Sequence, residues 1–177
     1  MSWAIWITGL PGSGKTALAC GAAAALEARG VPVKVLELDE IRKVVTPEPT
    51  YSDAEREIVY RALAYMAKLV TEAGVPVLID ATAPRRAWRE LARDLIPAFA
   101  EVQLLCPIEV CREREQRRHG GHAPPAIYAR GGQPGATVPG VDVPYEVSPR
   151  PELTLNTHEC DLRTAVEEVV SLAARLR

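Results

Sequence analysis

The chain has 177 residues, of which 47% are hydrophobic, and carries a formal net charge of -2. This length and apolar content favour one compact domain over residues 1–177. Acids and bases are mixed along the chain and no apolar stretch is long enough to cross a bilayer, so we expect neither nucleic acid nor a membrane as partner. Scattered cysteines without a CxxC pair and the lack of a basic leader before the first apolar run favour a cytoplasmic protein with reduced thiols.

Short apolar segments alternate with helical segments along the chain. We expect strands over residues 3–8, 31–38, 75–80 and 101–106, because each is a short apolar run between turn residues. Helices are expected over residues 15–29, from the capping box at Ser52 to Gly74, and over residues 84–96, 107–118 and 162–176. The alternation predicts an α/β fold of the P-loop NTPase type, a three-layer sandwich with a mostly parallel central sheet flanked by helices and a lid loop.

The first expected strand leads into the segment G-L-P-G-S-G-K-T at residues 9–16, which matches G-x-x-x-x-G-K-[ST]. Glycines allow the backbone N–H groups of this loop to approach phosphate oxygens, the lysine reaches the β and γ phosphates, and the hydroxyl binds magnesium. A chance match in a glycine-rich turn is the alternative, but a strand before and a helix after argue against it. We therefore expect ATP and Mg²⁺ as cofactors, with Thr16 on the metal. The expected nucleotide contacts are Gly9, Pro11, Gly12, Ser13, Gly14, Lys15, Thr16 and Ala17.

Two acids follow expected strands, Asp39 after residues 31–38 and Asp80 at the end of residues 75–80. Open α/β sheets bind ligands at the carboxyl ends of their strands, so both acids are candidates for catalysis and for Mg²⁺ binding. Asp39 would orient or deprotonate the acceptor hydroxyl, and Arg42 would hold an anionic group of the acceptor. A helix cap with a surface arginine is the alternative. Asp80 would hold a magnesium-bound water as Walker B acids do, or would cap a loop.

Arginines supply further candidates. Arg56 lies in the first turn of a helix, where a cation opposes the helix dipole unless a bound anion compensates, so it is either an acceptor ligand or a surface residue. Arg112, Arg114, Arg117 and Arg118 alternate with acids as on a solvated helix, and among them we assign a catalytic role to Arg114 alone. Glycine and proline then break all periodicity over residues 119–151, and loops of this length in compact domains are typically functional. We expect a lid and substrate loop at about residues 112–150.

These segments resemble the adenylylsulfate kinase family over nearly the whole chain. Residues 7–16 look like its phosphate loop, Asp39 with Arg42 looks like the end of its D-G-D-x-x-R segment, and residues 51–56 (Y-S-D-A-E-R) look like its F-S-x-x-D-R. Residues 110–114 are similar to the V-C-E-x-R at the start of its lid and residues 126–128 to the G-L-Y within it; residues 140–146 and 151–157 are similar to G-I-D-D-P-Y-E and P-E-L-x-L-D-T. The resemblance implies an ATP-dependent kinase of sulfate assimilation in which Arg56 contacts the nucleotide sulfate.

The departures from the family pattern fall on the acceptor side. Glu37 and Leu38 stand where the family has Asp and Gly, Val59 and Tyr60 lie where its N-I-R-R begins, and Pro125 stands where its lid lysine would be. Residues 81–84 (A-T-A-P) replace F-I-S-P, and residues 136–139 (A-T-V-P) replace the K-N-F-T whose ring stacks on the substrate adenine. Polar sites lose affinity strongly when partners are missing, so these changes predict a divergent acceptor site. The expected substrate contacts are Asp39, Arg42, Arg56, Thr82 and Val138.

Three hypotheses follow for the function. The first is a kinase that converts adenylylsulfate to 3′-phosphoadenylylsulfate. The second is the same phosphoryl transfer to another small anionic hydroxyl compound, such as a nucleotide or a nucleotide-linked capsule precursor; Asp39-x-x-Arg42 also resembles other small kinases such as polynucleotide kinase. The third is a non-catalytic nucleotide-binding regulatory module, against which Lys15, Thr16, Asp39 and Arg42 argue. A homodimer is compatible with all three.

Overall fold

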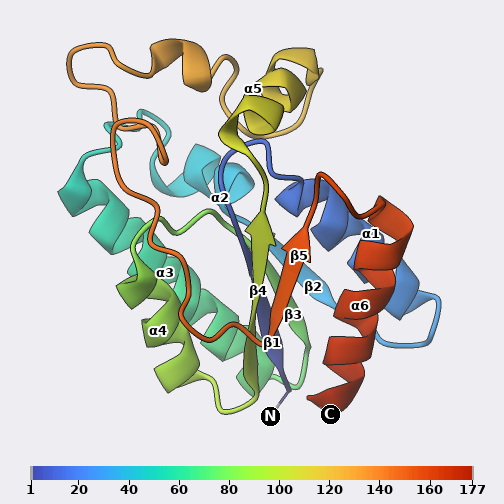
Figure 1. The fold of residues 1–177 in the computed structure, drawn as a ribbon. Coiled ribbons are helices and arrows are strands. Elements are labelled where there is room, and N and C mark those ends of the chain that lie inside the picture. The colour runs from blue at the N-terminus through green and yellow to red at the C-terminus, as the bar shows by residue number, and fades with distance from the viewer. Residues whose placement is uncertain (1, 177) are drawn as a thin grey trace.

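The computed structural model describes residues 2–176 and has a five-stranded sheet between two layers of helices (Figure 1). The strands are β1 (Ala4–Thr8), β2 (Lys34–Glu37), β3 (Val77–Asp80), β4 (Phe99–Leu105) and β5 (Leu153–Asn156). They lie in the order β2-β3-β1-β4-β5, and every neighbouring pair is parallel. The predicted three-layer α/β fold is confirmed, and its sheet is wholly parallel rather than mostly so.

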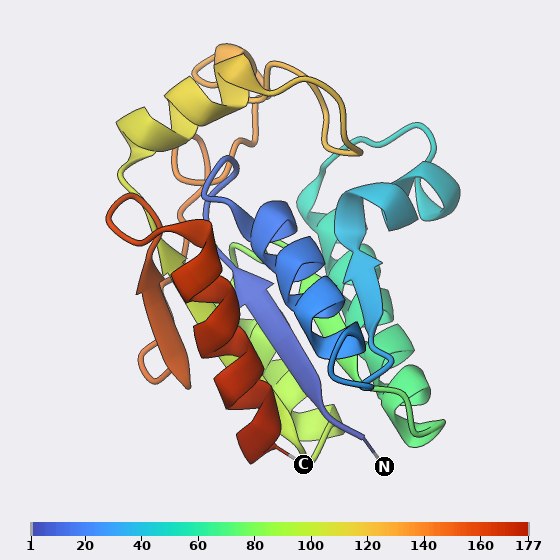
Figure 2. The same cartoon turned by 90° about the vertical axis from the view of Figure 1, so that its right-hand side faces the viewer.

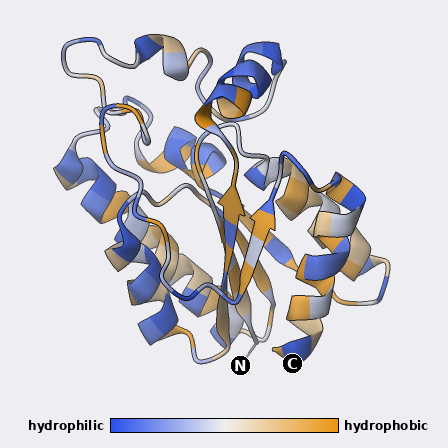
Figure 3. Ribbon diagram, in the orientation of Figure 1, coloured by the Kyte–Doolittle hydropathy of each residue, from blue (hydrophilic) through white to orange (hydrophobic). Residues whose placement is uncertain are grey.

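The helices cover both faces of this sheet (Figure 2). They are α1 (Lys15–Glu27), α2 (Leu38–Val45), α3 (Asp53–Glu72), α4 (Arg86–Leu95), α5 (Ile108–Arg117) and α6 (Leu162–Arg175). Ile5 and Ile7 of β1 pack with α1 and α6, whereas Ala4 and Trp6 pack with α3 and α4. Because successive side chains of a strand point to opposite faces, a central strand covered on both sides is mostly apolar, and Figure 3 shows hydrophobic stretches in the strands of this sheet.

Helix ends follow the local signals of the sequence. Gly30 and Gly74 adopt φ of 75° and 86°, and the N–H groups of Val31 and Val75 return to Leu26 and Val70 at 3.0 and 3.2 Å. These are Schellman-type ends, in which a glycine in the left-handed region terminates the helix. At the other end of α3, Ser52 accepts a hydrogen bond from the N–H of Glu55, as its capping sequence predicts.

Three elements differ from the expectation. The helix α2 has eight residues and was not among the helices expected above, and it includes Leu38, which was expected in the preceding strand. The strand β5 was not expected as a strand, because it is a short edge strand with one buried residue, Leu155, and so has little periodicity. Residues 118–152 are irregular as expected, except for the 3₁₀ turn Tyr128–Arg130.

The carboxyl ends of the strands meet at one edge, below α2, α5 and the irregular segment (Figure 1). Asp80, the last residue of β3, pairs with Ile7 of β1 and with Glu37 of β2. This register brings Asp80 beside the loop that follows β1. Within residues 2–176, no helix combines the length and the apolar character needed to cross a membrane.

Candidate active site

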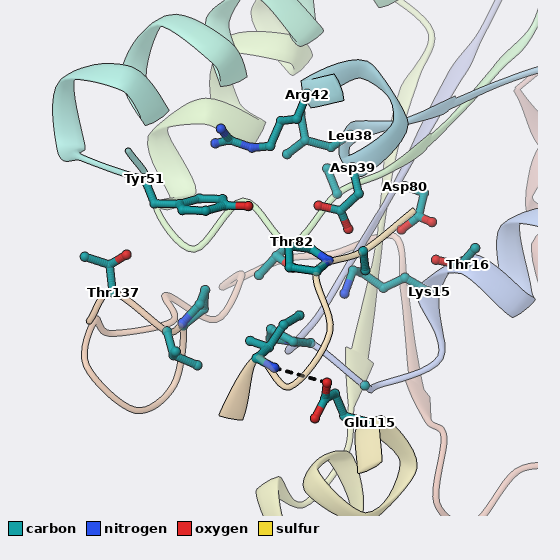
Figure 4. A pocket seen from close by; sticks show the side chains of 18 of the residues that line it. Lys15, Thr16, Leu38, Asp39, Arg42, Tyr51, Asp80, Thr82, Glu115 and Thr137 are labelled. Carbon is teal, nitrogen blue, oxygen red and sulfur yellow. Dashed lines mark hydrogen bonds between the residues drawn. The ribbon is translucent and has the colours of Figure 1, made fainter. Parts of the chain in front are cut away.

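A cavity of about 450 Å³ opens at this edge of the sheet. Its walls come from the loop after β1, from α2, from the start of α3, from the segment after β3 and from residues of the irregular segment up to Pro139 (Figure 4). Parallel α/β sheets bind ligands at this edge. The cavity therefore lies where the sequence predicted the site.

The phosphate loop forms the floor beside α1. Gly12 and Gly14 adopt φ of 79° and 99°, which side chains rarely tolerate. A Cβ on Gly12 would lie 2.3 Å from the carbonyl oxygen of Cys111 in α5, so glycine is also required there for packing. The expected nucleotide contacts that line the cavity are Pro11, Gly12, Gly14, Lys15, Thr16 and Ala17. Gly9 and Ser13 do not line it; they pack on each other, since a Cβ on Gly9 would lie 2.7 Å from Ser13 Oγ.

Lys15 and Asp80 face each other across this floor (Figure 4). Lys15 Nζ donates to the Leu10 carbonyl at 3.1 Å. Burial lowers the pKa of Lys15, and the charges of Asp80 and Asp39 oppose that shift. Burial raises the pKa of Asp80, while the Lys15 charge and a hydrogen bond from Thr16 lower it. The two groups thus depend on each other for their charged forms.

Two buried oxygens beside the loop have no hydrogen-bond partner within residues 2–176, Asp80 Oδ2 and Ser13 Oγ. Buried polar atoms in proteins nearly always have a partner, and an ion or a water can be the partner of such an oxygen. A carboxylate with the neighbouring Thr16 hydroxyl is the oxygen donor set that Mg²⁺ prefers. Asp39 also points its carboxylate into the cavity near Asp80 (Figure 4). The residues present therefore fit a magnesium ion.

Arg42 lines the cavity, but its charge is already matched. Its Nη1 lies 2.7 Å from Glu55 Oε1, and its guanidinium lies 5.1 Å from the centre of the Tyr51 ring. Burial would raise the pKa of Glu55, but hydrogen bonds from Thr50, from Arg42 and from the Tyr51 N–H lower it to about 2. Glu55 thereby fixes Tyr51, which has φ of 53°, with its ring in the cavity. In this arrangement Arg42 orients the aromatic wall, and it is not a free cation.

Arg56 is buried without a counterion. It is 7% exposed, and its Nη2 donates to the Thr137 carbonyl at 2.6 Å and to Thr137 Oγ1 at 3.1 Å. No carboxylate within residues 2–176 lies at ion-pair distance. Burial lowers the pKa of Arg56, as expected for a cation removed from water. A buried charge of this kind is costly unless an anion joins it, so the cavity favours an anionic ligand here.

The remaining predicted contacts also reach the cavity. Thr82 lines it, and its carbonyl accepts from Thr8 Oγ1 at 2.6 Å. Val138 lines it with 7% exposure, next to Thr137. Arg114 lines it beside Gly14 and is held by the Thr157 carbonyl at 2.6 Å. All expected substrate contacts and catalytic candidates are thus gathered in one cavity, while their individual roles stay predictions.

Sequence reasoning assigned no role to several residues that line the same cavity. Tyr51 was noted only as part of a family segment, and Tyr60 only as a departure from one. Tyr60 follows Arg56 by four residues on a helix, so helical spacing could have indicated it. Other lining residues, such as Thr137 and Ile127, lie in the irregular segment, where no periodicity shows which side chains face inward.

Comparisons with known proteins agree on one family. The model of the adenylylsulphate kinase family matches residues 1–156. The chain is 36% identical over 172 residues to adenylyl-sulfate kinase of Synechococcus sp. (strain JA-2-3B'a(2-13)), covering 97% of this chain and 94% of the relative. It is 36% identical over 164 residues to the probable adenylyl-sulfate kinase of Archaeoglobus fulgidus, covering 91% and 99%.

Solved structures of this family and of another kinase share the fold. Mycobacterium tuberculosis APS kinase CysC, solved in complex with AMPPNP and APS, superposes with a TM-score of 0.85 at 28% identity, covering 98% of both chains. A gluconokinase from Sinorhizobium meliloti 1021 superposes with a TM-score of 0.62 at 25% identity, covering 98% of this chain and 92% of that one. The chain belongs to the adenylylsulphate kinase family of phosphotransferases.

Proposed function

We propose that this protein transfers the γ-phosphoryl group of ATP to the 3′-hydroxyl of adenylyl sulfate, the reaction its relatives' names indicate. The observation that supports it best is Arg56, a buried guanidinium without a carboxylate partner, in the same cavity as the phosphate loop. This reaction requires a donor site and a site for an anionic acceptor, and the residues proposed for both line one cavity.

On the donor side, backbone N–H groups of the loop and the first turn of α1 bind the phosphates of ATP. Lys15 adds a positive charge at the transferred group. Thr16 and Asp80 would hold Mg²⁺, with Asp39 beside them, and the ion would neutralise charge on the phosphate oxygens. Arg114, fixed by Thr157, supplies a further cation at the loop.

On the acceptor side, the Asp39 carboxylate accepts the hydrogen bond of the attacking hydroxyl and orients it toward the phosphate. The Tyr51 ring offers one aromatic face for a base, and Arg56 attracts the anionic group. Catalysis of phosphoryl transfer depends mainly on such positioning and on electrostatic stabilisation. Residues 1–177 would act as one kinase domain with residues 112–150 as its lid and substrate loop; a cytoplasmic location and a homodimer stay predictions from the sequence.

A coupled assay of ADP release tests the proposal. Purified protein with ATP, Mg²⁺ and adenylyl sulfate should release ADP and form the 3′-phosphorylated product. Asp39→Asn should lower kcat by about 10²–10⁴ if the carboxylate acts on the hydroxyl proton. The matched control Glu40→Gln changes the exposed neighbour of Asp39 and should leave kcat unchanged. Absence of turnover with adenylyl sulfate at millimolar concentration would refute the proposal.

A second candidate is the same transfer to another anionic hydroxyl compound. Val138 supports it, because this aliphatic side chain lines the cavity where the family motif carries a ring. Because Tyr51 would stack on only one face of a base, the site would be less selective for a purine. A panel of nucleotide and sugar acceptors separates the two candidates by their kcat/KM, and a clear preference for an acceptor other than adenylyl sulfate would favour the second.

A further inference from the structure

Tyr60 of α3 is a rigidly held phenol in the cavity wall. Its side chain is buried, with 5% exposure, and it lines the cavity. The ring stacks on Trp88 of α4 at 4.3 Å between centroids and 12° between planes. Trp88 is itself fixed by a 2.7 Å hydrogen bond from its Nε1–H to Glu57. The phenol is therefore held in one orientation before any ligand binds.

The hydroxyl of Tyr60 keeps its donor free. Its oxygen accepts a hydrogen bond from the N–H of Ala83 at 3.1 Å, and within residues 2–176 this is the one hydrogen bond that it makes. A phenol can also donate one O–H, and buried donors in proteins are normally satisfied. Burial raises the pKa of Tyr60 to about 12, so the proton stays in place at neutral pH. The Tyr60 hydroxyl is therefore an uncharged hydrogen-bond donor at neutral pH.

Arg56 lies beside this donor. The two residues are four positions apart on α3 and so share a face of the helix. The guanidinium of Arg56 has no carboxylate partner, whereas Arg42, which also lines the cavity, is paired with Glu55. A buried cation and a buried neutral donor, four positions apart on α3, therefore line the same cavity.

We propose that the Tyr60 hydroxyl donates a hydrogen bond to the same oxyanion that Arg56 attracts, which makes Tyr60 a specificity-determining residue of the acceptor site. The group bound there would be a tetrahedral oxyanion with several acceptor oxygens, that is, a sulfate or a phosphate. One cation and one neutral donor can satisfy different oxygens of such a group. The inference rests on the proposed function only in naming adenylyl sulfate as the molecule that carries the oxyanion.

The substitution Tyr60→Phe tests this inference, because it keeps the ring and the stack on Trp88. We expect the KM for adenylyl sulfate to rise about 10- to 100-fold, the value of a hydrogen bond to a charged group, with kcat and the KM for ATP unchanged. The control Tyr65→Phe makes the same chemical change on an exposed tyrosine of α3 and should change neither KM. If Tyr60 only braced Ala83, the KM for adenylyl sulfate would rise no more than the KM for ATP. A fall in Tm is expected in either case, because Tyr60→Phe leaves the buried Ala83 N–H without its acceptor.

A binding measurement separates this inference from the proposed function. With ADP present to fill the phosphate loop, inorganic sulfate or inorganic phosphate should raise the Tm of the wild type and of Tyr65→Phe more than that of Tyr60→Phe. The more effective ion indicates which oxyanion the site prefers. Equal shifts in all three proteins, or equal KM values for adenylyl sulfate in wild type and Tyr60→Phe, would overturn the inference. Lack of adenylyl sulfate turnover with a Tyr60-dependent anion shift would instead refute the proposed function alone.

Discussion

Arg89 allows a quantitative test of how the acceptor side is held in place. Its side chain is fully buried in α4, and its Nε lies 2.8 Å from Glu101 Oε1, which is 4% exposed. The guanidinium also donates to the carbonyls of Ala83 and Glu146. One residue thus ties the segment after β3 to β4 and to the segment that precedes β5.

The substitution Arg89→Met keeps most of the volume and removes the charge. It leaves the Glu101 carboxylate buried without its cation and two carbonyls without donors. Breaking a buried ion pair by removing one partner costs about 3–5 kcal/mol. For a chain of this size each kcal/mol shifts the Tm by about 2–4 °C, so we expect the Tm to fall by roughly 10 °C. Circular dichroism during thermal and guanidinium unfolding measures both quantities.

A matched control lies one turn further along α4. Arg93 pairs with Glu152 through two hydrogen bonds of 2.6 and 2.8 Å, but both side chains are about a third exposed, at 37% and 31%. Solvent-exposed pairs contribute about 0–1 kcal/mol, so Arg93→Met should lower the Tm by only a few degrees. Equal losses in both variants would refute the argument, because it attributes the larger cost of Arg89→Met to its buried ion pair and to the two carbonyls left without donors.

The remaining predictions concern the phosphate loop and the aromatic wall. Gly12→Ala forces a Cβ against the Cys111 carbonyl and should raise the KM for ATP by at least about 10-fold. In the control Gly30→Ala the new Cβ has no atom within 4 Å, so this variant should lose stability without a change in ATP binding. Lys15→Ala removes a cation from the transferred phosphate and should lower kcat by about 10²–10³ in the coupled assay. Glu55 has a pKa lowered from 4.5 to about 2, so its contribution to stability is present above pH 4.5 and is lost as the pH falls toward 2. The free energy of unfolding of Glu55→Gln should therefore be about 2 kcal/mol lower than that of the wild type at neutral pH, and it should depend less on pH between 4.5 and 2. Unfolding by denaturant at a series of pH values measures both effects, and the same pH dependence in both proteins would contradict the assignment.

The donor half of the site could be predicted from the sequence because its determinants are contiguous. Six of the seven residues from Pro11 to Ala17 line the cavity, and the glycine torsions at Gly12 and Gly14 shape the loop locally. Asp39 and Asp80 were also predictable, since Asp80 ends β3, Asp39 follows β2 by two residues, and parallel strands end at one edge. No long-range information was required for either inference.

The acceptor half depends on segments that are far apart in the chain. Arg56 meets Thr137 across 81 positions, and Tyr60 meets Ala83 across 23. Arg42 was expected to hold an anionic group of the acceptor, and its ion pair with Glu55 could not be read from the sequence. Hydrophobic periodicity indicates which face of an element is buried, but it does not indicate which element covers that face.

The sequence by itself therefore determined the fold class and the place of the phosphate loop, because both follow from local pattern and from glycine geometry. The tertiary structure decided which cations are free and which donors face the acceptor. The strand order β2-β3-β1-β4-β5 brings α2, α3 and the segment after β3 together above one edge of the sheet. Only that arrangement leaves Arg56 buried without a counterion, with the hydroxyl of Tyr60 beside it.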